Sequence, residues 1–144
     1  MKIIAVDPGL YSGYAFWNSA DPRFLQRKEI PYQDTADRVW AEMEEWDEKP
    51  EIVVERYTMT PGIKSAQPHA LMTMGQLEFI ARRFATRLHY YLPSTNKKTV
   101  SDQRLRSAGW YLKTKDGHAN DAARLVGTHL AQHLPEVFGK LFGI

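Results

Sequence analysis

The spacing of apolar residues along the chain predicts an alternation of strands and helices. Short apolar runs bounded by Gly, Pro or charged residues are typical of strands, and they occur at 2–7, 13–17, 23–31, 50–57 and 88–93. Apolar residues at helical spacing predict long helices at 33–49, 68–88 and 118–134. One or two short helices are expected within 94–110, and a short apolar tail within 135–144.

The order of these elements predicts an α/β fold. Three consecutive strands favour an antiparallel meander, and helical crossovers then add two strands parallel to the first. The expected product is a mixed five-stranded sheet, with three antiparallel strands plus two parallel ones, flanked by helices on both faces. The chain has 144 residues, which is within the usual range for one domain, so 1–144 is expected to be a single domain.

Composition narrows the class of protein. The chain has no cysteine, which excludes disulfides and thiolate sites, and no apolar run approaches the roughly 20 residues that span a bilayer. A cytoplasmic protein is therefore expected, with no membrane partner. The net charge is +2, but residues 32–55 are acidic and residues 64–115 are basic. This asymmetry is compatible with a polyanionic partner on one side, and equally with two solvated helix faces.

Three carboxylates occupy positions that suggest a metal site. Asp7 ends the first strand, Glu55 follows the apolar run of the fourth, and Asp121 lies in the first turn of the helix at 118–134. If the first and fourth strands are parallel neighbours, Asp7 and Glu55 emerge at one sheet edge, where ligands gather in open α/β sheets. Carboxylates held this close need a cation, and oxygen ligands favour Mg²⁺ or Mn²⁺. Two such ions, about 3.5–4 Å apart, support phosphodiester hydrolysis.

Each of these carboxylates also has a structural explanation. Asp7 could cap the turn that Pro8 and Gly9 form, and Glu55 could pair with a neighbouring arginine. Asp121 is favoured near the start of a helix by the helix dipole. The metal hypothesis therefore requires that all three side chains meet around shared ions.

His118 lies three residues before Asp121, so the two side chains share a helix face. Its imidazole could bind the second metal ion or transfer protons, or could instead bond to backbone at the start of the helix. The remaining histidines have no carboxylate at a useful spacing and are expected to be structural; they are His69, His89, His129 and His133.

Four segments occur in the order found in a known family: IIAVDPGLYSGYAFW, IVVERY, LPSTNKK and GHANDAARL. Together they resemble the RuvC-type Holliday junction resolvases of the RNase H-like nuclease superfamily, and the resemblance covers residues 2–130. In length the chain looks more like the compact bacteriophage members than the bacterial enzyme. The resemblance implies an RNase H-like fold and a metal-dependent crossover junction endodeoxyribonuclease that acts in DNA recombination or repair.

Position by position, the resemblance assigns Asp7, Glu55 and Asp121 as catalytic, metal-binding carboxylates. His118 falls where many bacterial members carry another aspartate, and it is a further candidate for catalysis and metal binding. Asn120 is a candidate for a supporting role. Two Mg²⁺ ions per active site are expected, with Mn²⁺ as a possible substitute.

The resemblance also implies branched DNA, a four-way junction, as the partner. Lys98 resembles a basic residue that family members direct toward the DNA backbone, and Lys97 is the alternative if the register slips by one. Tyr57 and Met59 are candidates for stacking on an unpaired base, or for partial burial in a loop. The candidates for DNA binding are Tyr57, Met59, Lys64, Lys97, Lys98, Arg104, Arg106, Lys113 and Lys115.

Symmetric cutting of a junction needs two active sites, so the resemblance implies a two-fold homodimer. The helix at 68–88 is the candidate interface, although an apolar stripe at helical spacing is also typical of a core; its members are Leu71, Met74, Leu77, Ala81, Phe84 and Leu88. Two alternatives stay open. One is another RNase H-like nuclease acting on branched DNA or RNA–DNA hybrids, and the other is a non-catalytic nucleic-acid-binding module.

Overall fold

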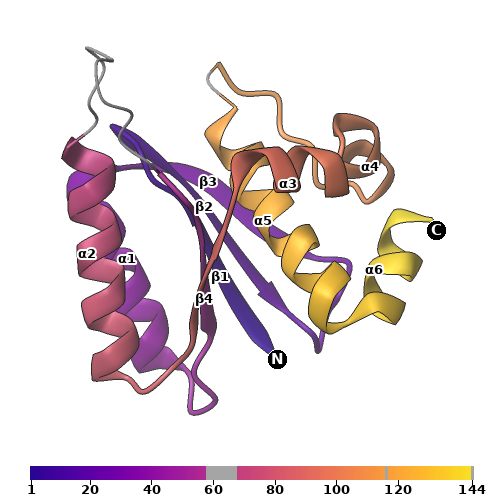
Figure 1. Ribbon diagram of the computed structural model, residues 1–144. Coiled ribbons are helices and arrows are strands. Elements are labelled where there is room, and N and C mark those ends of the chain that lie inside the picture. The colour runs from indigo at the N-terminus through magenta and orange to yellow at the C-terminus, as the bar shows by residue number, and fades with distance from the viewer. Residues whose placement is uncertain (58–67, 116, 144) are drawn as a thin grey trace.

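The computed structural model describes residues 1–57, 68–115 and 117–143 and shows an α/β fold (Figure 1). The strands and helices follow one another in the order β1 (Lys2–Asp7), β2 (Tyr11–Asn18), β3 (Leu25–Pro31), α1 (Tyr32–Glu45), β4 (Glu51–Glu55), α2 (Pro68–Arg83), β5 (Leu88–Tyr91), α3 (Pro93–Thr99), α4 (Asp102–Ser107), α5 (His118–His133) and α6 (Pro135–Phe142). Among the described residues, no helix combines the length and the apolar character needed to cross a bilayer.

The strands form one mixed sheet with the order β3-β2-β1-β4-β5. β1 pairs antiparallel with β2, and β2 pairs antiparallel with β3. β4 lies parallel to β1, and β5 lies parallel to β4. The predicted sheet of three antiparallel and two parallel strands is therefore confirmed.

Helices cover both faces of the sheet (Figure 1). α1 and α2 pack on one face, while α5 packs on the other, accompanied by α3, α4 and α6. Side chains alternate along β1, so Ile4 and Val6 join the core under α1 and α2, whereas Ile3 and Ala5 join the core under α5. α5 is buried along most of its length, which makes it the central helix of its layer.

The register between β1 and β4 brings two carboxylates to the same edge of the sheet. Val6 is the partner of Val54, so the next residues, Asp7 and Glu55, leave the sheet side by side. Parallel neighbours end at the same edge, whereas antiparallel strands would have placed these two ends at opposite edges. The fold therefore meets the first condition of the metal hypothesis.

A glycine in β2 lets α5 reach this edge. Gly13 is the partner of Asp7 across the sheet, and a Cβ atom built at Gly13 would lie 1.9 Å from the carbonyl oxygen of His118. No side chain larger than hydrogen fits between β2 and the first turn of α5. This close approach places His118 and Asp121 over the end of β1.

Two element ends differ from the predictions. α2 ends at Arg83 rather than near residue 88, and Ala85 takes a φ of 52° where the chain turns toward β5. Leu88 is the partner of Ile52 in β4, so sheet pairing overrides the helical spacing of the last apolar residues. The predicted apolar tail is the helix α6, which packs against α5.

The apolar stripe of α2 is also shifted from the predicted one. Leu71, a member of the predicted apolar stripe, is 40% exposed and so lies off the face of α2 that meets the sheet. The buried residues of this helix are Ala70, Thr73, Leu77, Ile80 and Ala81.

We expect Gly13→Ala to lower the free energy of unfolding by about 1–3 kcal/mol, because the added methyl group collides with the backbone at His118. Gly75→Ala is the matched control: nothing lies within 4 Å of a Cβ atom at Gly75 in α2, and alanine favours a helix over glycine by about 1 kcal/mol. Urea denaturation of both variants measures the difference. Equal stability of the two would contradict the close packing of α5 on β2.

Candidate active site

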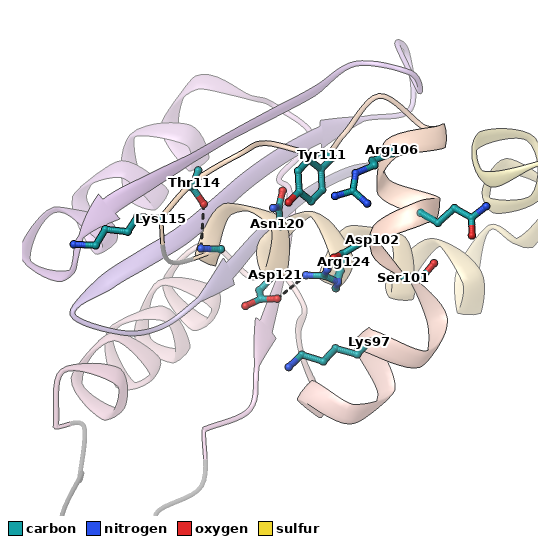
Figure 2. Close-up of a pocket in the computed structure, with 12 residues that line it drawn as sticks. Lys97, Ser101, Asp102, Arg106, Tyr111, Thr114, Lys115, Asn120, Asp121 and Arg124 are labelled. Atoms are coloured by element: carbon teal, nitrogen blue, oxygen red, sulfur yellow. Dashed lines mark hydrogen bonds and ion pairs between the residues drawn. The ribbon is translucent and has the colours of Figure 1, made fainter.

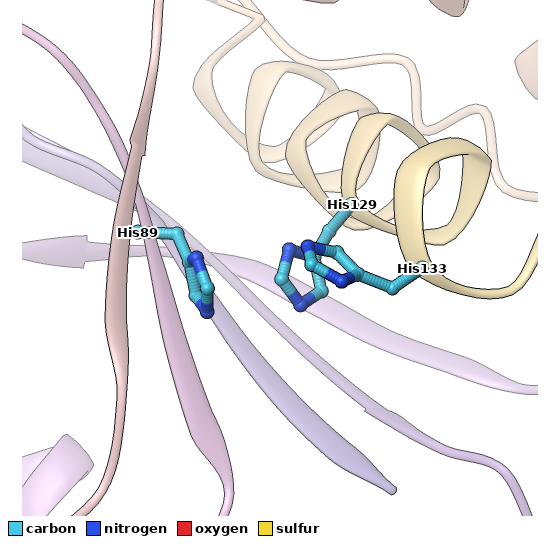
Figure 3. A group of neighbouring side chains, drawn as sticks. All are labelled: His89, His129 and His133. Carbon is cyan, nitrogen blue, oxygen red and sulfur yellow. The ribbon is translucent and has the colours of Figure 1, made fainter.

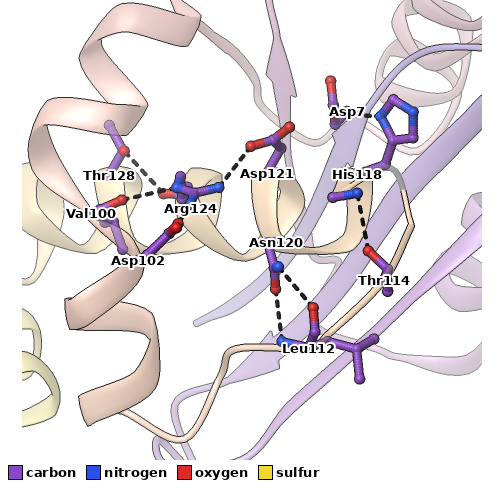
Figure 4. Close-up of polar contacts among 11 residues, drawn as sticks. Asp7, Val100, Asp102, Leu112, Thr114, His118, Asn120, Asp121, Arg124 and Thr128 are labelled. Carbon is purple, nitrogen blue, oxygen red and sulfur yellow. Dashed lines mark hydrogen bonds and ion pairs between the residues drawn. The ribbon is translucent and has the colours of Figure 1, made fainter.

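Three segments that are distant in sequence meet at the edge where β1 and β4 end. Asp7, which is 9% exposed, ends β1, and His118 and Asp121 stand in the first turn of α5. The ligand atoms of these three side chains all lie within 4.8 Å of one another. Nδ1 of His118 lies 3.2 Å from Oδ2 of Asp7, and Asp121 lies beside this pair (Figure 4).

Glu55 joins the cluster from the end of β4. Burial raises the pKa of Glu55 to about 8, and the negative charges of Asp7 and Asp121, together with a hydrogen bond to Asp7, add to this effect. The positive charge of Lys97 acts in the opposite direction. The raised pKa favours the protonated form of Glu55, and a divalent cation among these carboxylates would favour the ionised form.

Burial and the charge of Asp7 also shift the pKa values of Asp121 and His118. Burial, and next the charge of Asp7, raise the pKa of Asp121, while the ion pair with Arg124 opposes them. The hydrogen bond with Asp7 raises the pKa of His118, which burial alone would lower. The raised pKa favours the imidazolium form of His118, whose charge would offset part of the negative charge of Asp7.

Arg124 holds Asp121 in place. Its Nη1 atom donates to Oδ1 of Asp121 at 2.8 Å, its Nε atom donates to the carbonyl oxygen of Val100 at 3.0 Å, and its Nη2 atom pairs with Asp102 (Figure 4). The side chain of Arg124 is 11% exposed, so its charge is satisfied largely by these partners. Sequence reasoning missed this residue, although its position three residues after Asp121 in GHANDAARL is a signal for such a pair.

The segment before α5 is tied to the helix by Asn120. Oδ1 of Asn120 accepts from the backbone N–H of Leu112, and Nδ2 donates to the carbonyl oxygen of Leu112, both at 2.8 Å. Gly117 precedes the helix with a φ of 72°, and its N–H donates to the hydroxyl of Thr114. These bonds position the first turn of α5, in keeping with the supporting role expected for Asn120.

A groove of about 850 Å³ opens beside Asp121, between α5, α3, α4 and the segment before α5 (Figure 2). Lys97, Arg106 and Lys115 line it, and all three side chains are exposed. The guanidinium of Arg106 lies 4.2 Å from the centre of the Tyr111 ring, which also lines the groove. A groove with this charge and position is suited to the phosphates of a nucleic acid.

The predicted DNA-binding residues fall into four groups. Lys97, Arg106 and Lys115 line the groove, and Lys97 acts electrostatically on both Glu55 and Asp121. Lys98 and Lys113 are exposed but are not among the residues that line it, and Tyr57 is partly buried just after β4. Arg104 donates to the carbonyl oxygen of Thr99 and stacks over the Phe138 ring. Met59 and Lys64 lie outside the described residues.

The donors of this cluster fit a divalent cation. Asp7, Asp121 and Glu55 offer carboxylate oxygens, which Mg²⁺ and Mn²⁺ prefer, and His118 adds an imidazole nitrogen that transition metals bind well. After burial, the negative charges of Asp7 and Asp121 are the next causes of the raised pKa of Glu55, so these side chains repel one another. A bound cation would reduce this repulsion.

We expect the metal-free protein to lose stability as the pH rises from 6.5 to about 8.5. Glu55 keeps its proton up to about pH 8 in the folded chain but ionises near 4.5 when unfolded, so folding binds a proton in this window. The raised pKa of His118 acts in the same direction above its ordinary value of 6.5. Burial lowers the pKa of His129 from 6.5 to about 4. This shift makes stability rise with pH, but only between about pH 4 and 6.5, which is below the window considered.

Urea denaturation in the presence of a chelator, at several pH values, measures this loss. The variant Glu55→Gln, which cannot ionise, should show a flatter dependence. Mg²⁺ should stabilise the parent chain more at high pH than at low pH, because it binds the ionised carboxylates. A parent and a Glu55→Gln variant with the same pH dependence would contradict the assignment.

Comparisons with known proteins give a likeness in structure rather than in sequence. No model of a known protein family matches the chain, and no curated protein matches it. Among solved structures, the chain is similar to RuvC of Thermus thermophilus in complex with a Holliday junction substrate, with a TM-score of 0.69 and 15% identity, over 93% of this chain and 96% of that chain.

Two further structures agree with this likeness. A second structure of Thermus thermophilus RuvC matches with a TM-score of 0.59 and 16% identity, over 92% of this chain and 96% of that chain. The yeast mitochondrial Holliday junction resolvase Ydc2 matches with a TM-score of 0.50 and 13% identity, over 96% of this chain and 83% of that chain. The predicted likeness in fold is confirmed: the chain has the RuvC-like, RNase H-like fold across nearly its whole length.

Proposed function

We propose that the chain is a metal-dependent endonuclease that resolves Holliday junctions by hydrolysing phosphodiester bonds in four-way branched DNA. The observation that carries the proposal is the cluster of Asp7, Glu55, His118 and Asp121 beside a groove lined by exposed basic residues. The fold supports it, since RuvC, which shares this fold, has been solved with a Holliday junction substrate. The proposed place of action is the cytoplasm of a bacterial or phage-infected cell.

The cofactor is proposed to be two Mg²⁺ ions, with Mn²⁺ as a substitute, held by Asp7, Glu55, His118 and Asp121. Bound ions of this kind polarise a phosphate and make water a better nucleophile at neutral pH. Arg124 keeps the carboxylate of Asp121 in one orientation through the bond at 2.8 Å. Nδ1 of His118, 3.2 Å from Oδ2 of Asp7, would lose any proton it carries when the imidazole binds the ion.

The groove is proposed to bind the DNA backbone. Lys97, Arg106 and Lys115 would neutralise phosphates without reading the base sequence, which suits a substrate recognised by its branched shape. Of these three residues, Lys97 is the one whose charge lowers the pKa of both Glu55 and Asp121. It is therefore the proposed contact to the backbone next to the cleaved bond.

We also propose that two chains form a two-fold dimer through α2. Met72 and Phe79 on this helix are 54% and 57% exposed, and they border a largely apolar groove shared with Trp40 of α1. Two copies joined by such a surface would bring two active sites to one junction.

Sedimentation of the parent chain should show a dimer, and sedimentation of the variant Phe79→Asp should show a monomer. A parent chain that stays monomeric at micromolar concentration would contradict the proposal.

We expect Asp7→Asn to reduce cleavage of a labelled four-way junction by at least about 100-fold while junction binding persists, because the variant loses a metal-binding charge and keeps the basic groove. Asp21→Asn, at an exposed turn between β2 and β3, is the matched control and should cleave like the parent. Parallel assays with a flap and an RNA–DNA hybrid measure the preference for junctions. Cleavage by Asp7→Asn equal to that of the parent, or cleavage that survives a chelator, would contradict the mechanism.

We expect Lys97→Ala to weaken junction binding by about 3- to 10-fold and to reduce the salt dependence of binding by about one ion, because one phosphate contact is lost. Lys98→Ala removes the same charge from the next position, outside the residues that line the groove, and should have a smaller effect. Binding titrations at several salt concentrations measure both. A larger loss for Lys98→Ala would instead place Lys98 against the DNA.

A further inference from the structure

A second group of potential ligands lies at the opposite ends of β4 and α5 from the carboxylate cluster. His89 comes from β5, and His129 and His133 lie one turn apart on α5, with the three rings close together (Figure 3). The centre of the His129 ring lies 4.6 Å from that of His89 and 4.2 Å from that of His133. One nitrogen from each ring lies within 4.8 Å of the others.

Glu51, at the start of β4, adds a carboxylate to these three imidazoles. Its Oε1 atom lies 3.0 Å from Nε2 of His89 and 3.8 Å from Nε2 of His129. Three nitrogens and one oxygen are a donor set that Zn²⁺ accepts in four-coordinate sites. The four residues come from β4, β5 and α5, so an ion among them would join the sheet to the central helix.

The buried imidazole of His129 is the observation that points to a ligand. The side chain is 0% exposed, and within the described part of the chain its Nε2 atom has no hydrogen-bond partner. The carboxylate of Glu51, at 3.8 Å, is beyond hydrogen-bond distance. A polar atom that is removed from water without a partner is costly, and a metal ion at Nε2 would provide the partner.

The other ring nitrogen of His129, Nδ1, has a hydrogen-bond partner, as the second nitrogen of a metal-binding histidine commonly does. Nδ1 lies 2.8 Å from the hydroxyl oxygen of Tyr91, and that hydroxyl lies 3.3 Å from Oε1 of Gln132. When Nδ1–H donates to Tyr91 and Tyr91 donates to Gln132, the lone pair of the ring is on Nε2, where the ion would bind. This direction of the two bonds gives the tautomer that coordination requires.

We propose that His89, His129, His133 and Glu51 bind a transition-metal ion of the Zn²⁺ type. Imidazole-rich donor sets select such ions over Mg²⁺, which prefers oxygen. Tetrahedral zinc requires its ligand atoms to lie about 3.3–3.4 Å apart. The three nitrogens lie within 4.8 Å of one another, so the rings must draw closer around an ion, and the exposed side chain of His133 has room to move. Glu51 and Glu55 stand about 13 Å apart along β4, so the ion stabilises the fold and takes no part in the cleavage chemistry.

The test uses untagged protein carrying Asp7→Asn, with Mg²⁺ in excess, so that the carboxylate cluster does not compete for the probe. The probe is Co²⁺, because its four-coordinate complexes absorb visible light far more strongly than six-coordinate ones. We expect one Co²⁺ per chain, a four-coordinate spectrum and displacement by one equivalent of Zn²⁺. Zn²⁺ should also raise the midpoint of thermal unfolding by several degrees.

Variants in the same background locate the ion. His133→Ala and His89→Gln, at positions that are exposed or partly buried, should weaken Co²⁺ binding at least tenfold and remove the thermal shift. His69→Gln is the control, since His69 packs on the Tyr32 ring, outside this group, and it should bind like its background. Absence of binding at about 100 µM Co²⁺, a six-coordinate spectrum, or unchanged affinity in His133→Ala would overturn the proposal.

Discussion

The repulsion among carboxylates gathered at one edge of the sheet is the constraint on which the functional interpretation depends. The parallel pairing of β1 and β4 places Asp7 and Glu55 together, and the glycine in β2 lets α5 add Asp121 and His118. A fold maintained for stability alone would have little reason to bury such a group. Burial, and next the negative charges of Asp7 and Asp121, raise the pKa of Glu55, and a cation among the carboxylates would relieve the part that comes from these charges.

The sequence was sufficient for the features that depend on local pattern. Short apolar runs and turn residues predicted the five strands, and a carboxylate directly after an apolar run marked Asp7 and Glu55 as unusual. The sequence also predicted that His118 and Asp121 share a face of α5, because the helical repeat fixes which residues lie on one side. What local patterns could not give was tertiary packing: the turn after Arg83 follows from pairing of Leu88 with β4, and the exposure of Leu71 follows from how α2 rests on the sheet.

Contacts between distant segments explain the other omissions. The partners of Arg124 on α4 and in the Val100 segment are 22 and 24 residues away, so only the contact with Asp121 had a sequence signal. The choice between Lys97 and Lys98 depends on which side of α3 faces the groove, and one sequence leaves that open. His129 has no carboxylate nearby in sequence, yet the sheet brings Glu51 and His89 to it.

The burial of α5 has a consequence for how the chain acquires activity. Asp121 and His118 belong to a helix that is enclosed by the sheet and by α3 and α6, and Asp7 is separated from His118 by 111 positions in the sequence. A partly folded intermediate with only the sheet and the α1–α2 layer would hold two carboxylates and lack the rest. The complete set of four side chains at the proposed site would therefore form only when the second layer packs on the sheet, as a cooperative step of folding.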